Sequence, residues 1–330
     1  MESNVPKLWR VLRRRVLTPS ITETLLTERG FHKKTPEAQD LLETVGRRFL
    51  EGYAYAVEAR SPAAAEKRLE GVPAQFRGFA YEGAAMGFAM LDGLPLGGDR
   101  SVAGFLAGRG DQHIYMVYVG IGWAMARLPR FRWPDVAALD PLLRWLVLDG
   151  YGFHQAYFHT DRYVGEQFRD SRLPWPADLS PAYVSRAVDQ GIGRALWFVG
   201  GTDADLVATL IDKFPESRRP DLYSGAGLAA TYAGGADEDE LRVLCRRAGP
   251  HRHLLAQGAA FAAEARLRAG LLVPHTVAAA RVLCGMTPAD AARVTHDSRP
   301  TGSVPGDLPA YEVWRQRIAE KFTALGRCQP

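Results

Sequence analysis

Gly120-Ile121-Gly122-Trp123-Ala124 is one copy of a short signature, Gly-x-small-x-small, that returns along the whole chain. Its seven copies begin at Gly52, Gly83, Gly120, Gly150, Gly191, Gly225 and Gly258. They follow one another at roughly 34 residues, a period typical of helical repeat proteins. Each copy lies in a long apolar run with helical spacing, which favours helix over strand. The signature therefore predicts an all-α protein of about seven tandem helical hairpins.

The recurrence of glycine inside these helices requires a compensating interaction, because glycine costs a helix roughly 1 kcal/mol relative to alanine. The first glycine and the residue four positions later share one face of a helix, and small residues there let a neighbouring backbone approach. We expect each unit to be a long inner helix followed by a short outer helix. Such units stack into a solenoid or a closed α/α toroid with a concave cavity.

A second, longer similarity indicates a duplication of several units at once. Residues shifted by 142 positions match, and the matching set is Pro73, Arg77, Tyr81, Gly83, Ala84 and Gly93 with Pro215, Arg219, Tyr223, Gly225, Ala226 and Gly235. With the Pro-rich linkers at 129–141, 170–181 and 297–309, this predicts four parts. They are a basic N-terminal segment (1–35), a first repeat half (36–169), a second repeat half (182–296) and a C-terminal capping helix (310–330).

Helix-capping residues mark the starts of the short outer helices. Ser, Thr and Asp are preferred at N-caps, and Pro is preferred at the first helical position. The candidate starts are Ser61-Pro62, Asp99, Thr202-Asp203 and Asp237.

Composition and charge narrow the function classes. Lys and Arg total 41 against 37 Asp and Glu, giving a net charge of +4 without basic blocks, so nucleic acid is a poor candidate partner. Three dispersed cysteines suggest a reducing compartment, and we expect a cytoplasmic protein. The longest apolar stretch, 114–128, is too short to span a bilayer.

The N-terminal segment carries a different signal. Leu8, Trp9, Leu12 and Val16 alternate with Arg10 and Arg13–Arg15 in a basic amphipathic pattern. This pattern is compatible with peripheral attachment to an anionic membrane or with docking to a membrane-protein partner. The alternative is a helix that packs on the first repeat and exposes its arginines.

The residues immediately before and three after each glycine define the face that should line the concavity. They are mixed polar and aromatic, and the candidate ligand-binding residues among them are Glu51, Tyr55, Glu82, Trp123, Phe153 and Arg194. Such a wall suits an elongated apolar ligand with a few polar anchors. The alternative is that these aromatic side chains simply fill the core between helices.

His154 breaks the repeat, because it occupies a position that holds Ala or Gly in the other six units. A departure from a structural rule often marks function, and a histidine is a natural acid–base group. His154 and Asp149 are therefore the first catalytic candidates, followed by His159 and His113. His154 and His159 cannot readily chelate one metal, since five residues turn a helix by about 140°, so we predict no metal site. No motif identifies a cofactor.

Three segments, GFAMLDGLPLGG (87–98), GRGDQHIYMVYVGIGWAMARLPR (108–130) and DPLLRWLVLDGYGFHQAYF (140–158), resemble an actinobacterial family described as a domain of unknown function, DUF1702. Its members are similar to a small protein of enediyne antibiotic clusters. The resemblance covers nearly the whole chain, and it implies maturation of a linear polyene or polyyne from an iterative polyketide synthase toward the enediyne core. It also implies two companion proteins, one of them an integral membrane protein, but no catalytic residue.

Two alternatives remain open. One is a non-catalytic adaptor or hydrophobic-ligand carrier within the biosynthetic complex. The other is a terpene-cyclase-like α/α barrel, against which the lack of a DxDD or DDxxD motif counts.

Overall fold

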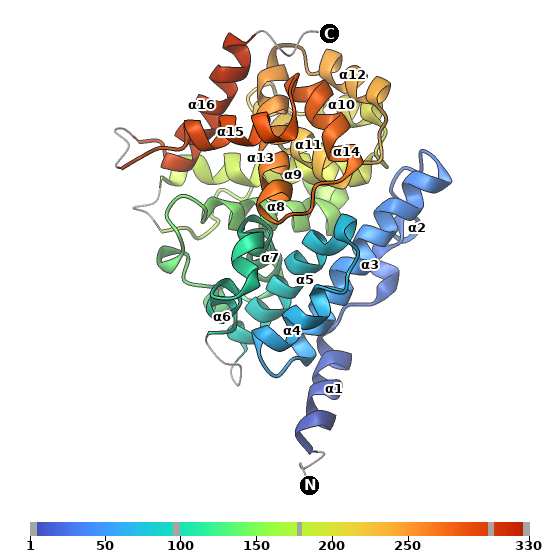
Figure 1. Ribbon diagram of the computed structural model, residues 1–330, viewed down its shortest axis with the longest axis vertical. Helices are drawn as coiled ribbons and strands as arrows, with labels where there is room; N and C mark the ends of the chain where they lie inside the picture. Colours follow the sequence, from blue (N-terminus) through green and yellow to red (C-terminus); the bar gives the residue numbers. More distant parts are fainter. Residues whose placement is uncertain (1–4, 95–99, 177–179, 303–306, 326–330) are drawn as a thin grey trace.

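The computed structural model describes residues 5–94, 100–176, 180–302 and 307–325. Every regular element in these ranges is a helix, and no strand occurs among them (Figure 1). The predicted all-α class is thus confirmed. None of the helices built from the described residues combines the length and apolar character that crossing a bilayer requires.

Seven long helices each carry one copy of the signature. They are α3 (Pro36–Glu58), α5 (Ala74–Gly93), α7 (Ile114–Arg127), α8 (Trp145–Phe158), α9 (Val184–Val199), α11 (Arg219–Ala233) and α13 (Arg252–Arg268). Consecutive inner helices pack against each other, and these six pairs make the most extensive helix–helix contacts among the described residues. We call these seven the inner helices.

The glycines of the signature are the points where the inner helices touch backbone to backbone. A Cβ atom on Gly120 would lie 2.3 Å from the carbonyl oxygen of Glu82 in α5, and one on Gly122 would lie 2.0 Å from that of Val147 in α8. No side chain fits at such distances. The expected close approach of neighbouring backbones is therefore present.

The two close contacts use different positions from those the sequence suggested. From the second unit onward the first glycine faces the preceding inner helix, as does Gly87 four residues after Gly83. The second contact falls two residues after the first glycine, because two residues turn a helix by about 200° and so reach the following helix. The same pairing recurs at Gly150 and Gly152, Gly191 and Gly193, and Gly225 and Gly227.

Shorter outer helices connect some of the inner helices. They are α4 (Pro62–Leu69), α6 (Ser101–Leu106), α10 (Ala204–Asp212), α12 (Glu238–Arg247) and α14 (Pro274–Ala279). The side chains of Ser61, Asp203 and Asp237 accept backbone N–H groups at three helix starts, as predicted. Asp99, the fourth predicted start, lies outside the described residues.

Two connections depart from the expected hairpin. Only 3₁₀ turns, η3 (Arg130–Arg132) and η4 (Val136–Ala138), separate α7 from α8. The π turn η5 (Asp161–Gly165) and the 3₁₀ turn η6 (Pro181–Tyr183) separate α8 from α9. The prolines in both connections account for the difference, since proline lacks the N–H that a continuing helix needs.

The two halves share local structure at equivalent positions. Nε of Arg77 donates to the carbonyl oxygen of Val72 at 3.1 Å, and Nε of Arg219 donates to that of Phe214 at 2.9 Å. Both contacts span five residues at the start of an inner helix. Across the predicted boundary between the halves, α8 and α9 still pack closely, with Gly152 against Val188.

Helix α1 (Val5–Leu17) extends from one end of the molecule (Figure 1). Nε of Arg13 donates to the carbonyl oxygen of Val57 at 2.6 Å, and Arg14 pairs with Glu58 at 2.9 Å, so these arginines hold α1 to the C-terminus of α3. Trp9 is 60 % exposed and Val16 is 72 % exposed. The alternative in which α1 packs on the first repeat is thus confirmed, with Arg14 and Arg15 exposed. The contact is nevertheless made through Arg13 and Arg14 and leaves Trp9 and Val16 exposed. Between α1 and α3 lies the short helix α2 (Leu26–Arg29).

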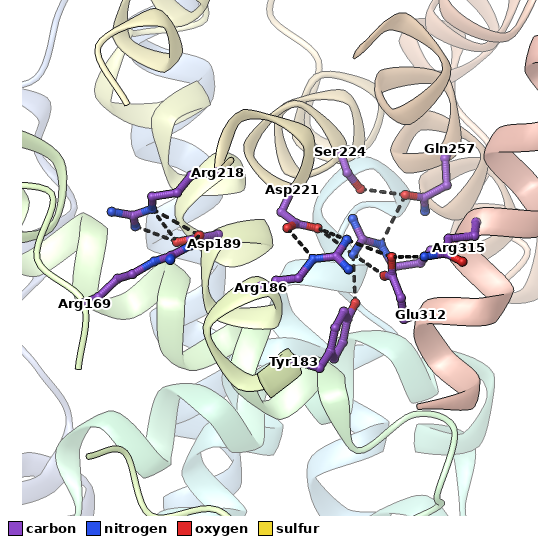
Figure 2. A network of polar contacts seen from close by, with 11 residues as sticks. Arg169, Tyr183, Arg186, Asp189, Arg218, Asp221, Ser224, Gln257, Glu312 and Arg315 are labelled. Carbon is purple, nitrogen blue, oxygen red and sulfur yellow. Dashed lines mark hydrogen bonds and ion pairs between the residues drawn. The ribbon is translucent and has the colours of Figure 1, made fainter. Parts of the chain in front are cut away.

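The C-terminal helices α15 (Pro288–Ser298) and α16 (Ala310–Ala324) pack on α13 and cover the end of the array. Figure 2 shows the buried ionic network that fixes α16. Nη1 of Arg315 donates to Asp221 at 2.8 Å and to Glu312 at 2.9 Å. This network ties the last helix to α11.

Candidate functional site

A cavity lies at the centre of the inner helices, and the space between its lining atoms, together with the open solvent at its mouth, is about 820 Å³. Six of them, α3, α5, α7, α8, α9 and α11, provide its wall, together with Pro19, Glu23 and Thr24 from the segment after α1. We call this the central cavity. Its aromatic lining consists of Phe49, Phe79, Trp123, Phe153, Tyr157, Phe158, Phe198 and Tyr232. Its largely apolar wall is typical of small-molecule sites.

The repeat positions account for most of this wall. The residue three after each signature glycine lines the central cavity in five units, and these residues are Met86, Trp123, Phe153, Arg194 and Leu228. The residue seven after the glycine lines it in four, namely Arg127, Tyr157, Phe198 and Tyr232. We did not predict this second set. Extending the spacing by one more step of four residues would have found it.

Glu51 and Tyr55, from the first unit, do not line the cavity. Their side chains bond to each other, and Glu51 also pairs with Arg48 at 2.7 Å on a partly exposed surface. Helix α3 has no preceding inner helix, and its Gly52 faces the following one, α5. The helix is thus rotated, and residues such as Val45 and Phe49 line the cavity instead.

A second cavity lies among α7, α8, α9, α11, α13 and α16, and the space between its lining atoms, open solvent included, is about 500 Å³. Arg194, Leu228 and Tyr232 line both cavities. The other lining residues of the second cavity are Tyr115, Met116, Val119, Leu143, Leu146, Asp149, Phe261, Ala262, Ala265, Tyr311 and Trp314. Phe261 lies three residues after Gly258, the glycine of the seventh unit. This position therefore lines a cavity in the seventh unit as well.

Arg194 is the buried cation of the site. It bonds to Asp149 through Nη1, and Asp149 also accepts a hydrogen bond of 2.8 Å from Gln190. Arg194 and Asp149 are 5 % and 1 % exposed. The carboxylate of Asp149 is therefore engaged by two donors and does not act as a free base. Nε of Arg194 has no hydrogen-bond partner within the described part of the protein.

Glu82 is the second carboxyl group beside Arg194. Its Oε1 lies 3.9 Å from Nη2 of Arg194, too far for a hydrogen bond. Burial raises the pKa of Glu82 to about 7; the charge of Asp149 adds to the increase, and Arg194 opposes it. A carboxyl with this pKa exchanges a proton near neutral pH, which is the property of a general acid or base. Glu82 is thus the strongest acid–base candidate.

His154 lines the central cavity, as expected, but its environment changes its chemistry. Its ring packs against Trp123 and Phe158, with ring centroids 5.5 and 4.7 Å away, and Nδ1 has no hydrogen-bond partner among the residues that the structure places. Burial lowers the pKa of His154 to about 3. The imidazole is therefore neutral at pH 7 and suits a hydrogen bond to a ligand better than proton storage.

His113 and His159 do not line either cavity. His113 is buried against the ring of Tyr81, with centroids 3.7 Å apart, and burial lowers its pKa to about 3. His159 is the C-cap of α8 and is exposed, because the helix ends there. The structure thus brings Glu82, Trp123, Asp149, Phe153, His154 and Arg194 to the two cavities and leaves Glu51, Tyr55, His113 and His159 outside them.

No group of three metal-binding side chains occurs among the residues that the structure describes. The acidic side chains and arginines at the cavities are Arg194 with Glu82 and Asp149 around it, and Glu23 and Arg127 on the wall of the central cavity. These groups can hold and move a proton, and they can bond to an oxygen atom of a ligand.

Comparison with known proteins covers nearly the full length of the chain. Residues 8–322 match the model of a family described as a protein of unknown function, DUF1702. No curated protein and no solved structure shows significant similarity to the chain. The chain therefore belongs to the DUF1702 family.

Proposed function

We propose that this protein binds a linear polyene from an iterative polyketide synthase in its central cavity and helps to convert it toward an enediyne core. The observation that carries the proposal is the pairing of an aromatic wall with one buried acid–base group, Glu82. The apolar wall favours a conjugated hydrocarbon through burial of its surface. The pathway itself rests on the resemblance of the family to the enediyne-cluster protein.

The chemistry that these side chains supply is proton transfer. The carboxylate of Glu82 removes a proton from a carbon next to the conjugated system, and the electron pair of that C–H bond moves into the polyene. The resulting carboxylic acid returns the proton to another carbon, so a double bond migrates and the formula of the ligand does not change. Arg194, 3.9 Å from Glu82, stabilises the negative charge at each stage. The neutral His154 is a further hydrogen-bonding group on the same wall.

The test is incubation of the purified protein with the linear polyene released by an iterative polyketide synthase, followed by absorption spectroscopy. The natural sequence should bind the polyene and shift its absorption bands. Glu82→Gln should bind the polyene with similar affinity, but the polyene released from this variant should have an unchanged absorption spectrum. Glu51→Gln is the matched control, because Glu51 lies outside both cavities, and it should behave like the natural sequence. Turnover by Glu82→Gln would contradict the role of Glu82.

The second candidate function is that of a hydrophobic-ligand carrier. The observation that favours it is the low basicity of His154 combined with the engagement of Asp149 by Arg194 and Gln190. A carrier needs only the apolar wall. Binding of the polyene by the natural sequence with no spectral change in the released ligand would support the carrier.

We also infer that the roughly seven units form one closed turn around the cavity and not an extended stack. Side chains from distant units support this arrangement. Arg266 in α13 donates to the carbonyl oxygens of Gln75 at 3.0 Å, beside the start of α5, and of Tyr232 at 2.6 Å. Lys34 pairs with Glu240 at 2.7 Å, across most of the chain.

The N-terminal helix supplies the proposed contact with a membrane. Its exposed Trp9 and Val16 accompany basic side chains, a combination that favours an anionic lipid surface. Pro19 and Glu23, in the segment that follows α1, line the central cavity. Docking of α1 would therefore bring the cavity close to a lipid surface, where an apolar ligand or a membrane-protein partner is found.

A further inference from the structure

The second cavity has no role in the proton transfer assigned to Glu82, yet it directly adjoins the site. Arg194, Leu228 and Tyr232 each contact both cavities, so these three side chains form the partition between them. Leu228 is only partly buried and is a flexible side chain. The partition is therefore thin, and one of its members can change rotamer.

Outside the partition, polar groups at the second cavity are bonded within the protein. The hydroxyl of Tyr311 accepts a hydrogen bond of 3.1 Å from Gln190. The indole N–H of Trp314 donates to the carbonyl oxygen of Thr295 at 2.7 Å. Asp149 is engaged by Arg194. What remains for a ligand is hydrocarbon and aromatic surface, which accepts an apolar chain without leaving polar groups unpaired.

The partition itself is different, because it holds two polar groups without a hydrogen-bond partner among the described residues, Nε of Arg194 and the hydroxyl of Tyr232. Nε of Arg194 is buried without a hydrogen-bond partner, and the residue lines both cavities. A buried donor without a partner is costly, so a ligand oxygen at this point would gain a strong, charge-assisted hydrogen bond.

We infer that the two cavities form one binding site for a long linear chain that passes Arg194 and carries an oxygen substituent at that point. One apolar end of the chain occupies the central cavity, and the other end occupies the second cavity, closed by α16. The second cavity thus selects for chain length. This inference rests on the proposed function only in taking the ligand to be an apolar chain bound in the central cavity.

The test measures binding and needs no turnover. The probe is methyl cis-parinarate, a fluorescent conjugated tetraene, displaced by methyl octanoate, methyl dodecanoate and methyl hexadecanoate. These uncharged esters avoid a bias from the charge of Arg194. With the natural sequence, affinity should rise along the series, and a hydroxyl group at mid-chain of methyl hexadecanoate should increase affinity severalfold.

Two matched variants separate the cavities. Ala265→Phe fills the second cavity. It should lower the affinity for methyl hexadecanoate about tenfold and leave the affinity for methyl octanoate unchanged. Ala229→Phe fills the central cavity and should weaken all three esters. Met116→Trp is a second filling variant for the second cavity, and circular dichroism reports whether each variant is folded.

Each outcome decides between the hypotheses. Equal effects of Ala265→Phe or Met116→Trp on short and long esters, or no effect at all, would overturn the single long site. No gain from the mid-chain hydroxyl would overturn the role of Arg194. If the natural sequence bound neither the probe nor any ester, the apolar ligand of the proposed function would fail as well. A failure of Glu82→Gln to abolish turnover would leave this binding result intact.

Discussion

Oε1 of Glu82 lies 3.9 Å from Nη2 of Arg194, and both side chains are buried. The arginine bonds directly to Asp149 instead. The buried positive charge of Arg194 thus interacts more strongly with Asp149 than with Glu82. Glu82, which has the weaker interaction, keeps its proton to near-neutral pH.

The raised pKa of Glu82 predicts a specific dependence of stability on pH. In the unfolded chain this carboxyl ionises near pH 4.5, but in the folded protein it ionises near pH 7. Between these values the folded state binds more protons than the unfolded state, so the free energy of unfolding falls as the pH rises. The loss attributable to Glu82 is about 3 kcal/mol by pH 8. Urea denaturation across this range measures it.

Glu82→Gln should remove this contribution, since the amide cannot ionise. As the pH rises, the free energy of unfolding of Glu82→Gln should therefore fall less than that of the natural sequence. The free energy of unfolding of the control Glu51→Gln should fall as much as that of the natural sequence. Identical pH dependence in Glu82→Gln and the natural sequence would show that Glu82 ionises normally.

Asp149→Asn should destabilise the protein by about 3–5 kcal/mol, because it leaves the buried guanidinium of Arg194 without its main counter-charge. Chemical denaturation at pH 7 measures this loss. The same change should lower the pKa of Glu82, since it removes a like charge and frees Arg194 to pair with Glu82. Infrared titration of the protonated carboxyl band follows that pKa.

The control for this experiment is the double variant Glu82→Gln, Asp149→Asn, which should lack the titrating band. An unchanged or raised pKa of Glu82 in Asp149→Asn would contradict the unequal sharing of Arg194.

Gly193→Ala should be severely destabilising, although replacing glycine by alanine within a helix usually stabilises it. The new Cβ would lie 2.1 Å from the carbonyl oxygen of Leu222, so α9 and α11 would have to separate. We expect a loss of about 3 kcal/mol or failure to fold. Thermal unfolding followed by circular dichroism is the measurement. Gly165→Ala is the matched control, because no atom lies within 4 Å of its added Cβ, and a melting temperature as low as that of Gly193→Ala would refute the packing argument.

Trp9→Glu should abolish binding to anionic vesicles, because it places a negative charge on the exposed apolar face of α1. Co-sedimentation with vesicles of phosphatidylcholine and phosphatidylglycerol measures the bound fraction. The natural sequence should bind these vesicles, bind pure phosphatidylcholine more weakly, and lose affinity at high salt.

The matched control for α1 is Phe131→Glu, which changes another exposed aromatic residue, one that is 82 % exposed in η3. It should sediment like the natural sequence. Equal binding by Trp9→Glu and the natural sequence would exclude α1 as the membrane contact.

Much of the fold could be predicted because its causes are local. The apolar spacing around Gly120, the capping residues Ser61 and Asp203, and the recurrence of the signature depend on neighbours within a few residues. The position three after each glycine also predicted Trp123, Phe153 and Arg194 as lining residues, since a helix carries its periodicity into the array.

The sequence by itself determined the helices and the face that most of them turn to the cavity. Only the tertiary structure decided which buried group could hold a mobile proton. Arg194 could have paired with Glu82 or Asp149, and the choice depends on how α9 is placed relative to its neighbour α8 and to α5, which is distant in the sequence. The same long-range packing rotated Glu51 and Tyr55 out of the wall and left His154 desolvated. Charge pairing and desolvation depend on which segments meet in space, and local spacing along the chain does not specify that.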